Sequence, residues 1–172
     1  GEPPAKAIIL SGGPSSVNIE GAPDMDGGLL SFDIPLLGIC YGMQLISDAF
    51  GAAVGAGVQG EYGRTRITVQ RPAGLLKSFA SGEETTVWMS HGDSVGGVPD
   101  GFNALAHSEN GVLSAIGHEE RPIFGVQFHP EVVHTERGKD MLGSFVFDYA
   151  GCSADWNMGD FVEEACEAIR QQ

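Results

Sequence analysis

The feature that most constrains the fold is the heptapeptide at residues 38–44, Gly-Ile-Cys-Tyr-Gly-Met-Gln, because it joins an apolar run directly to a helical pattern. The run Ile-Pro-Leu-Leu at 34–37 predicts a buried strand, and apolar residues recur at helical spacing after the heptapeptide as far as Phe50. We therefore expect a strand, a sharp turn at Cys40 and a helix. Glycines stand two residues before and after Cys40, which is the pattern of a nucleophile elbow, where small neighbours permit a strained turn that presents the central side chain.

Cys40 is the first candidate for catalysis. At a helix N-terminus, the free N–H groups and the positive end of the macrodipole favour the thiolate form of a cysteine. A single cysteine in an apolar strand is more often a small buried hydrophobic residue. The catalytic interpretation is favoured here because a second apolar run ends in His129, and the carboxylate of Glu131 follows two residues later.

Composition excludes several classes of function. The chain has 172 residues, 42% of them hydrophobic, which is enough for the core of one domain. A net charge of −14 repels phosphate groups and argues against binding to nucleic acids or anionic membranes. Three cysteines without a C-x-x-C pair indicate neither a disulfide framework nor a zinc site, and a working thiol fits the reducing cytoplasm. We see no signal peptide and no apolar run of about 20 residues that would predict a membrane span.

The order of the expected elements predicts an α/β fold. Two continuous apolar strands with weakly helical residues between them suggest a parallel βαβ unit. An antiparallel meander is expected at 103–128, with a hairpin turn at Asn110-Gly111 and a second turn at 119–122. We therefore predict an open, mostly parallel central sheet with flanking helices and a small antiparallel meander. The individual expectations are strands at 7–10, 35–39, 65–69 and 86–89, and helices at 41–50 and 135–149.

The ends of the chain suggest a piece of a longer protein. The sequence starts without methionine and reaches its first strand almost at once. We expect one domain at 1–150 and a connector at 151–172, with helical spacing from 159 to 172. The alternative for this tail is an amphipathic helix that packs on its own domain.

Three loops that follow strands are expected to meet at one edge of the sheet, where parallel α/β folds place their chemistry. Cys40 would attack a carbonyl carbon, His129 would move the proton, and Glu131 would orient the imidazole. The oxyanion would be bound by the amide of Tyr41 and by an amide of the Gly12-Gly13 loop, with Gly13 favoured because a residue without Cβ permits close approach.

A fourth segment, at 89–93, is expected to end the strand that contains Trp88, and its polar groups suit the charged ends of an amino acid. Gln44, one helical turn after Cys40, can face the same pocket or simply the solvent. A catalytic pair of His91 and Asp93 is an alternative to the pair of His129 and Glu131. A metal site formed by His91, His129 and His134 is a further alternative, although their spacing does not support tetrahedral ligation.

These motifs resemble the class I (triad-type) glutamine amidotransferase family. The general signature is matched at 11–14, 38–44 and 129–131, and the likeness extends over residues 5–150. The runs at 88–93 and 125–135 are similar to the glutaminase domains of GMP synthases in particular. The resemblance implies a triad of Cys40, His129 and Glu131 and oxyanion amides at Gly13 and Tyr41. It also implies that glutamine is held by Gln44, Ser90, Gly92 and Asp93.

The function implied by the resemblance is hydrolysis of glutamine to glutamate through a thioester on Cys40. The ammonia would pass to an ATP-pyrophosphatase (synthetase) domain or subunit that uses ATP and Mg²⁺ to activate xanthosine monophosphate for GMP synthesis. We expect no cofactor and no metal in this chain, which lacks a phosphate-binding glycine loop. The family also allows a homodimer formed through the absent synthetase domain.

The chain departs from the family at its start, because the usual first strand-helix unit before Ala5 is missing. Its absence predicts an unpaired sheet edge near residues 7–10. Two rival functions remain: a non-catalytic interaction module of the same fold, and another cysteine hydrolase, such as a peptidase or a γ-glutamyl hydrolase.

Overall fold

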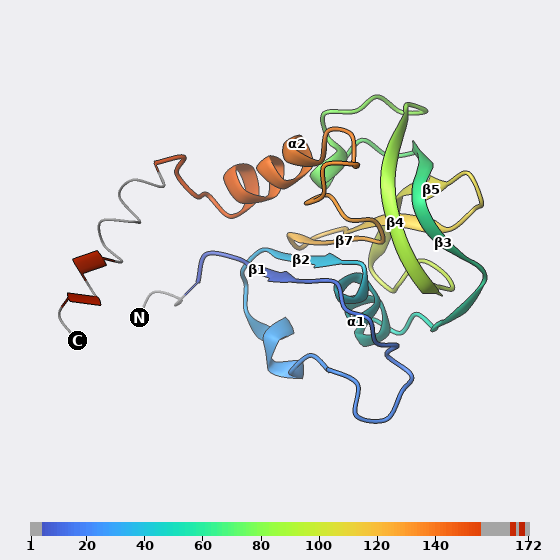
Figure 1. The fold of residues 1–172 in the computed structure, drawn as a ribbon, viewed down its shortest axis with the longest axis horizontal. Coiled ribbons are helices and arrows are strands. Elements are labelled where there is room, and N and C mark those ends of the chain that lie inside the picture. Colours follow the sequence, from blue (N-terminus) through green and yellow to red (C-terminus); the bar gives the residue numbers. More distant parts are fainter. Residues whose placement is uncertain (1–4, 156–165, 168, 171–172) are drawn as a thin grey trace.

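The structure is a computed structural model that describes residues 5–155, 166, 167, 169 and 170, with the backbone alone at 56–59. The described residues form one seven-stranded sheet in the order β1-β2-β7-β6-β5-β3-β4 (Figure 1). The strands are β1 (Ile8–Leu10), β2 (Leu36–Ile39), β3 (Val54–Val69), β4 (Glu84–Val95), β5 (Phe102–Ser108), β6 (Leu113–His118) and β7 (Ile123–Val126). The helical elements are η1 (Gly27–Ser31), α1 (Tyr41–Ala49), η2 (Gly74–Leu76), α2 (Gly138–Gly143) and η3 (Ser144–Tyr149).

The prediction of a mostly parallel sheet is wrong for the described residues. Only β1–β2 and β2–β7 are parallel pairs, and the pairs β7–β6, β6–β5, β5–β3 and β3–β4 are antiparallel. The predicted meander is present, with its turn at Asn110-Gly111, but it is not a separate small sheet. Its last strand, β7, pairs with β2 on one side and with β6 on the other, which joins both halves into one mixed sheet.

The core forms on both faces of this sheet because successive strand residues point in opposite directions. In β2, Leu36 packs on the face that α1 covers, together with Met43 and Ile46 of that helix. Leu37 packs on the opposite face, where Met141 and Phe145 follow. The three parallel strands are thereby held between α1 on one side and the α2–η3 segment on the other (Figure 1).

The helix predicted at 135–149 begins three residues late. It starts as α2 at Gly138 and continues as a π-helix, η3, to Tyr149. Thr135 lies outside it because its hydroxyl donates to the carbonyl of His129 at 2.6 Å and accepts from the amide of Trp88 at 3.0 Å. The loop between His129 and the helix is therefore tied to β4.

The other helix predictions have mixed outcomes. The helix predicted at 41–50 corresponds to α1, which ends one residue earlier. The helix predicted at 159–172 lies mostly outside the described residues. Across the part of the chain that the structure describes, no helix combines the length and apolar character that crossing a membrane requires.

Candidate active site

Cys40 occupies the sharp turn between β2 and α1. Its φ of 51° and ψ of −105° make it one of two non-glycine residues with positive φ in the described chain. The turn is closed by a hydrogen bond of 2.7 Å from the amide of Cys40 to the carbonyl of Val126 in β7. Such strained backbone persists only where its surroundings fix it, and it is common at active sites. The predicted elbow is therefore present.

The two glycines of the elbow are required by close backbone contacts. A Cβ on Gly38 would lie 2.5 Å from the carbonyl carbon of Gly42. A Cβ on Gly42 would overlap the carbonyl oxygen of Leu10 in β1. The first turn of α1 thus lies directly on the ends of β2 and β1, and this contact fixes the direction of the Cys40 side chain.

The three predicted loops leave the same edge of the sheet. Strands β1, β2 and β7 are adjacent and parallel, and Leu10, Gly38 and Gly125 lie side by side in register. The residues that follow these strands are therefore neighbours. Gly12 lies between the other two loops, since a Cβ there would lie 2.9 Å from Cε1 of His129 and 3.5 Å from Cβ of Cys40.

His129 is held between Cys40 and Glu131. Its Nδ1 lies 2.7 Å from Oε1 of Glu131, and its backbone amide donates to the carbonyl of Trp88 at 3.0 Å. Hydrogen bonding to the Cys40 side chain, and secondarily to Glu131, raises the pKa of His129 to about 9 despite the opposing effect of partial burial. The imidazole therefore favours its protonated form beside the sulfur atom of Cys40.

A cavity of about 380 Å³ opens beside Cys40. Six of the predicted site residues line it: Gly13, Cys40, Gln44, Ser90, Gly92 and Asp93. Its volume lies within the roughly 300–1,000 Å³ usual for small-molecule sites. Ile19 and Tyr62 also line the cavity, with 60% and 71% of their surface exposed, so they stand at its mouth.

Gly13 and Tyr41, the predicted oxyanion residues, are neighbours. A Cβ on Gly13 would lie 3.7 Å from the ring of Tyr41, an ordinary contact distance. The Tyr41 side chain leads away from the cavity, and its hydroxyl donates to the carbonyl of Pro23 at 2.5 Å. Burial, and secondarily the charge of Asp24, raise the pKa of this phenol.

The prediction that residues 89–93 end a strand is wrong. They lie inside β4, which continues to Val95 and remains paired with β3, as in the pair of Glu61 and His91. The pairing is irregular between Ala56 and Glu61. Segment 90–93 therefore borders the cavity as part of a bent strand rather than as a loop.

Comparisons with known proteins agree with this geometry. The profile of the class I glutamine amidotransferase family matches residues 2–149. The chain belongs to this family. It is 46% identical over 166 residues to a glutamine-hydrolysing GMP synthase of Brachyspira hyodysenteriae, and 47% identical over 167 residues to that of Thermobifida fusca. These alignments cover 96% and 97% of the chain but 32% and 31% of the relatives, so the chain spans about a third of the length of the curated relatives it matches.

Solved structures support the same family. A protein of Thermoplasma acidophilum that is assigned to GMP synthase superposes with a TM-score of 0.71 and 33% identity, covering 85% of this chain and 73% of that one. A glutamine amidotransferase of Methylobacillus flagellatus, with a TM-score of 0.60, 23% identity and coverage of 74% and 52%, supports the fold alone. This amidotransferase domain is therefore an enzyme domain of the class I type.

The two alternative sites suggested by the sequence do not fit the observed geometry. His91 contacts the backbone carbonyl of Asp93, at 2.9 Å from Nδ1, and not its carboxylate. The ring of His134 packs at a tilt against the ring of Trp88, with 4.8 Å between the centroids, rather than against His91 or His129. Within the described residues, no three His, Cys, Asp or Glu side chains come together in a way that could hold a metal ion.

Sequence reasoning missed two groups of residues in this amidotransferase site. Gln127 donates from Nε2 to the sulfur of Cys40 at 3.7 Å, and Gln44 donates to Oε1 of Gln127 at 3.3 Å. The isolated polar residue between Val126 and Phe128 was a usable signal, because a glutamine in a buried run needs partners. The buried pair of Glu61 and His91 had no such signal, since Glu61 stands in a glycine-rich stretch without periodicity.

Proposed function

We propose that this domain is the glutaminase of a GMP synthase, and that it hydrolyses glutamine to glutamate and ammonia with Cys40, His129 and Glu131. The observation that carries the proposal is the series formed by Cys40, His129 and Glu131 beside a cavity of about 380 Å³. Identities near 46% to glutamine-hydrolysing GMP synthases support this choice among class I functions.

The first half of the reaction forms a thioester. The sulfur of Cys40 attacks the side-chain amide carbon of glutamine, and the carbonyl oxygen becomes an oxyanion. The backbone amides of Gly13 and Tyr41 bind this oxyanion, and losing one such donor costs about 3 kcal/mol of barrier. His129 donates its proton to the leaving nitrogen, and the C–N bond breaks to release ammonia.

The second half restores the enzyme. Neutral His129 accepts a proton from water, and the resulting hydroxide attacks the thioester carbon. The C–S bond breaks, glutamate leaves, and the Cys40 thiolate again faces protonated His129. Glu131 keeps Nδ1 of the imidazole engaged throughout, so that the other ring nitrogen serves the reacting atoms.

Glutamine would bind with its side-chain amide at Cys40 and its charged ends at Ser90, Gly92 and Asp93. Gln44 supports this wall of the cavity by donating to the carbonyl of Asp93 at 3.0 Å. The ammonia would serve an ATP-pyrophosphatase domain or subunit that binds ATP, Mg²⁺ and xanthosine monophosphate, and this domain would also provide any dimer contact. We propose residues 1–150 as the glutaminase and 151–172 as the connector to that partner, acting in the reducing cytoplasm.

The test measures ammonia release from glutamine by the purified chain, alone and with a GMP-synthase ATP-pyrophosphatase domain, ATP, Mg²⁺ and xanthosine monophosphate. We expect activity that rises with the loaded partner and falls at least about 10³-fold in Cys40→Ala, because this variant lacks the proposed nucleophile. Activity indifferent to the partner would favour a stand-alone hydrolase. Full activity in Cys40→Ala would refute the mechanism.

A further inference from the structure

A buried pair of ionisable side chains lies next to the cavity without a role in the proposed reaction. Glu61 of β3 and His91 of β4 face each other in the sheet, with 3.2 Å between Oε2 and Nε2. Their side chains are only 2% and 1% exposed. Burying two ionisable groups is costly unless all of their polar atoms are engaged, so the partners of this pair are informative.

Every polar atom of the pair has a partner. Oε1 of Glu61 accepts from Ser108 Oγ at 2.7 Å and from Asn110 Nδ2 at 2.8 Å. Nδ1 of His91 lies 2.9 Å from the carbonyl oxygen of Asp93. A carbonyl can only accept, so this nitrogen must carry a hydrogen atom. A second proton is shared between Nε2 of His91 and Oε2 of Glu61. The hydrogen bond from Nδ1 of His91 to the carbonyl of Asp93 is the same whichever of these two atoms carries it.

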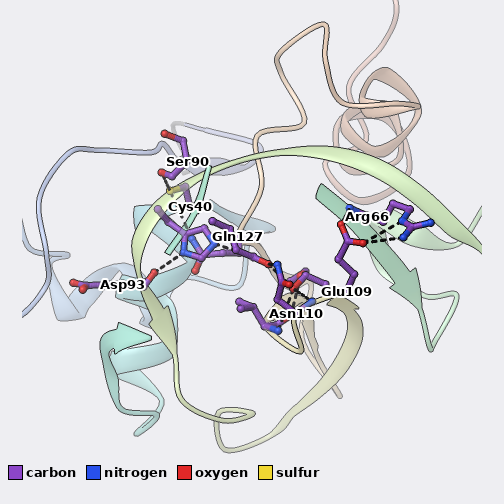
Figure 2. Close-up of polar contacts among 12 residues, drawn as sticks. Cys40, Arg66, Ser90, Asp93, Glu109, Asn110 and Gln127 are labelled. Atoms are coloured by element: carbon purple, nitrogen blue, oxygen red, sulfur yellow. Dashed lines mark hydrogen bonds and ion pairs between the residues drawn. The ribbon is translucent and has the colours of Figure 1, made fainter. Parts of the chain in front are cut away.

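The carbonyl of Asp93 connects this pair to the nucleophile. It accepts a second hydrogen bond from Nε2 of Gln44, whose amide also donates to Gln127. Gln127 in turn donates to the sulfur of Cys40. Figure 2 shows contacts of this network between Asn110 and Cys40, and the further contact from the Cys40 thiol to the carbonyl of Ser90 at 3.7 Å. The donors Gln44 and His91 thus hold the carbonyl of Asp93 pointing into the protein and away from the cavity.

We propose that Glu61 and His91 are positioning residues that fix segment 90–93 in the shape that binds glutamine. The inference rests on the proposed function, because it assigns the pair to the substrate wall of that same site. His91 holds the carbonyl of Asp93, and Glu61 holds the ring of His91. The polar groups of Ser90 and Gly92 are thereby left at the cavity, where both residues lie.

Matched variants at Glu61 separate this role from a general packing role. Glu61→Gln keeps an oxygen for Ser108 and Asn110, and its amide N–H can donate to Nε2 of a neutral His91 that retains its Nδ1 hydrogen. Glu61→Leu removes the acceptor for Ser108 and Asn110 and also the partner of Nε2, so that the imidazole of His91 is no longer held. Because the two variants are similar in size, a difference between them reports hydrogen bonding rather than volume.

The experiment measures steady-state ammonia release, and calorimetric binding of glutamine in a Cys40→Ala background. For Glu61→Leu we expect the KM and the Kd for glutamine to rise about tenfold or more, consistent with a lost buried hydrogen bond. The kcat should stay within about threefold, and Glu61→Gln should resemble the wild type. Thermal denaturation shows whether each variant is folded.

A second pair of variants covers the case in which Glu61→Leu does not fold. His91→Asn keeps an N–H donor near the position of Nδ1, whereas His91→Leu does not, so glutamine should bind more weakly to His91→Leu. Folded variants with a lower melting temperature but unchanged KM and Kd would overturn the inference alone. A wild-type chain that neither binds nor hydrolyses glutamine would overturn the proposed function as well.

Discussion

The placement of the proposed catalytic residues depends on small backbone details at single positions. Cys40 is presented by a positive φ of 51°, and its neighbour His129 is approached by Gly12, where there is no side chain. The turn at Cys40 and the absence of a side chain at Gly12 together leave room for the Cys40 and His129 side chains to approach each other. The consequences can be tested one residue at a time.

Gly12→Ala should impair catalysis more than stability. The added methyl group would lie 2.9 Å from Cε1 of His129, so the imidazole must shift from its position. Moving a mobile ring costs little folding energy, but misplacing a catalytic group by about 1 Å costs roughly 10²-fold in rate. We expect kcat for ammonia release to fall by about that factor, with the free energy of unfolding changed by less than about 1 kcal/mol.

Gly13→Ala is the matched control, because it adds the same methyl group to the same loop without a close contact. Its Cβ would meet the Tyr41 ring at 3.7 Å, which is ordinary contact. We expect a much smaller loss of kcat than for Gly12→Ala. Equal losses in both variants would show that the loop backbone, and not the contact with His129, is what the substitutions disturb.

The pKa of His129 should depend on Cys40. It is raised from 6.5 to about 9 chiefly by the Cys40 side chain. A raised pKa means that the folded state holds the proton more tightly, so its contribution to stability is complete below pH 6.5 and is lost as the pH rises through about 9. NMR titration of the imidazole should give a midpoint near 9 in the wild type and a lower one in Cys40→Ala.

The same protonation state sets the alkaline limit of activity. We expect kcat/KM to fall as the pH passes about 9, where His129 loses the proton that the leaving ammonia requires. An unchanged His129 midpoint in Cys40→Ala would contradict the assigned cause of the shift.

At the scale of elements, the site depends on how α1 starts. The first turn of this helix rests on the ends of β1 and β2 because Gly38 and Gly42 leave no side chain at the contact. β4 then passes over this edge and supplies both the cavity wall and the carbonyl of Trp88 that binds the amide of His129.

Gly42→Ala should therefore destabilise the domain. The new Cβ would overlap the carbonyl of Leu10, and neither the strand nor the helix backbone can yield cheaply. We expect a loss of about 3 kcal/mol in the free energy of unfolding, the upper part of the usual range for overpacking. Urea denaturation measures it, with Gly27→Ala as control because a Cβ at Gly27 meets nothing within 4 Å. A loss below about 1 kcal/mol would contradict the close-contact argument.

At the level of the whole sheet, β1 forms one edge among the described strands. In the part of the chain that the structure describes, β1 is an edge strand and pairs with β2 alone. Ile9, at its centre, is 48% exposed. Exposed strand edges of this kind pair readily with other chains.

Ile9→Lys should reduce self-association of this chain, because a charge on an edge strand opposes pairing with a second copy. Light scattering at increasing protein concentration measures the effect. The free energy of unfolding should change by less than about 1 kcal/mol, because Ile9 is exposed. Val98→Lys is a suitable control, since Val98 is 47% exposed but lies between β4 and β5. Equal effects of both substitutions would indicate net charge rather than the edge as the cause.

The sequence alone determined the local parts of this protein. The elbow at Cys40, the helix α1 and the hairpin turn at Asn110-Gly111 follow from short-range patterns. The proximity of the loops at Gly12, Cys40 and His129 was predicted only through the expectation that their strands are parallel neighbours. Glycine positions, apolar runs and helical spacing act over a few residues, so they can be read directly. The family signature, carried by the same short motifs, was readable for the same reason.

Strand pairing, and which side chains are buried between the strands, depend on contacts that form only in the complete fold. A short apolar strand such as β7 does not encode whether its neighbours run parallel or antiparallel, and here it has one of each. The length of β4 and the burial of Glu61 beside His91 likewise depend on β3, which lies about 30 residues earlier in the chain. Polar residues gain their role from partners far away in the sequence, and those partners are brought together only when the sheet is complete.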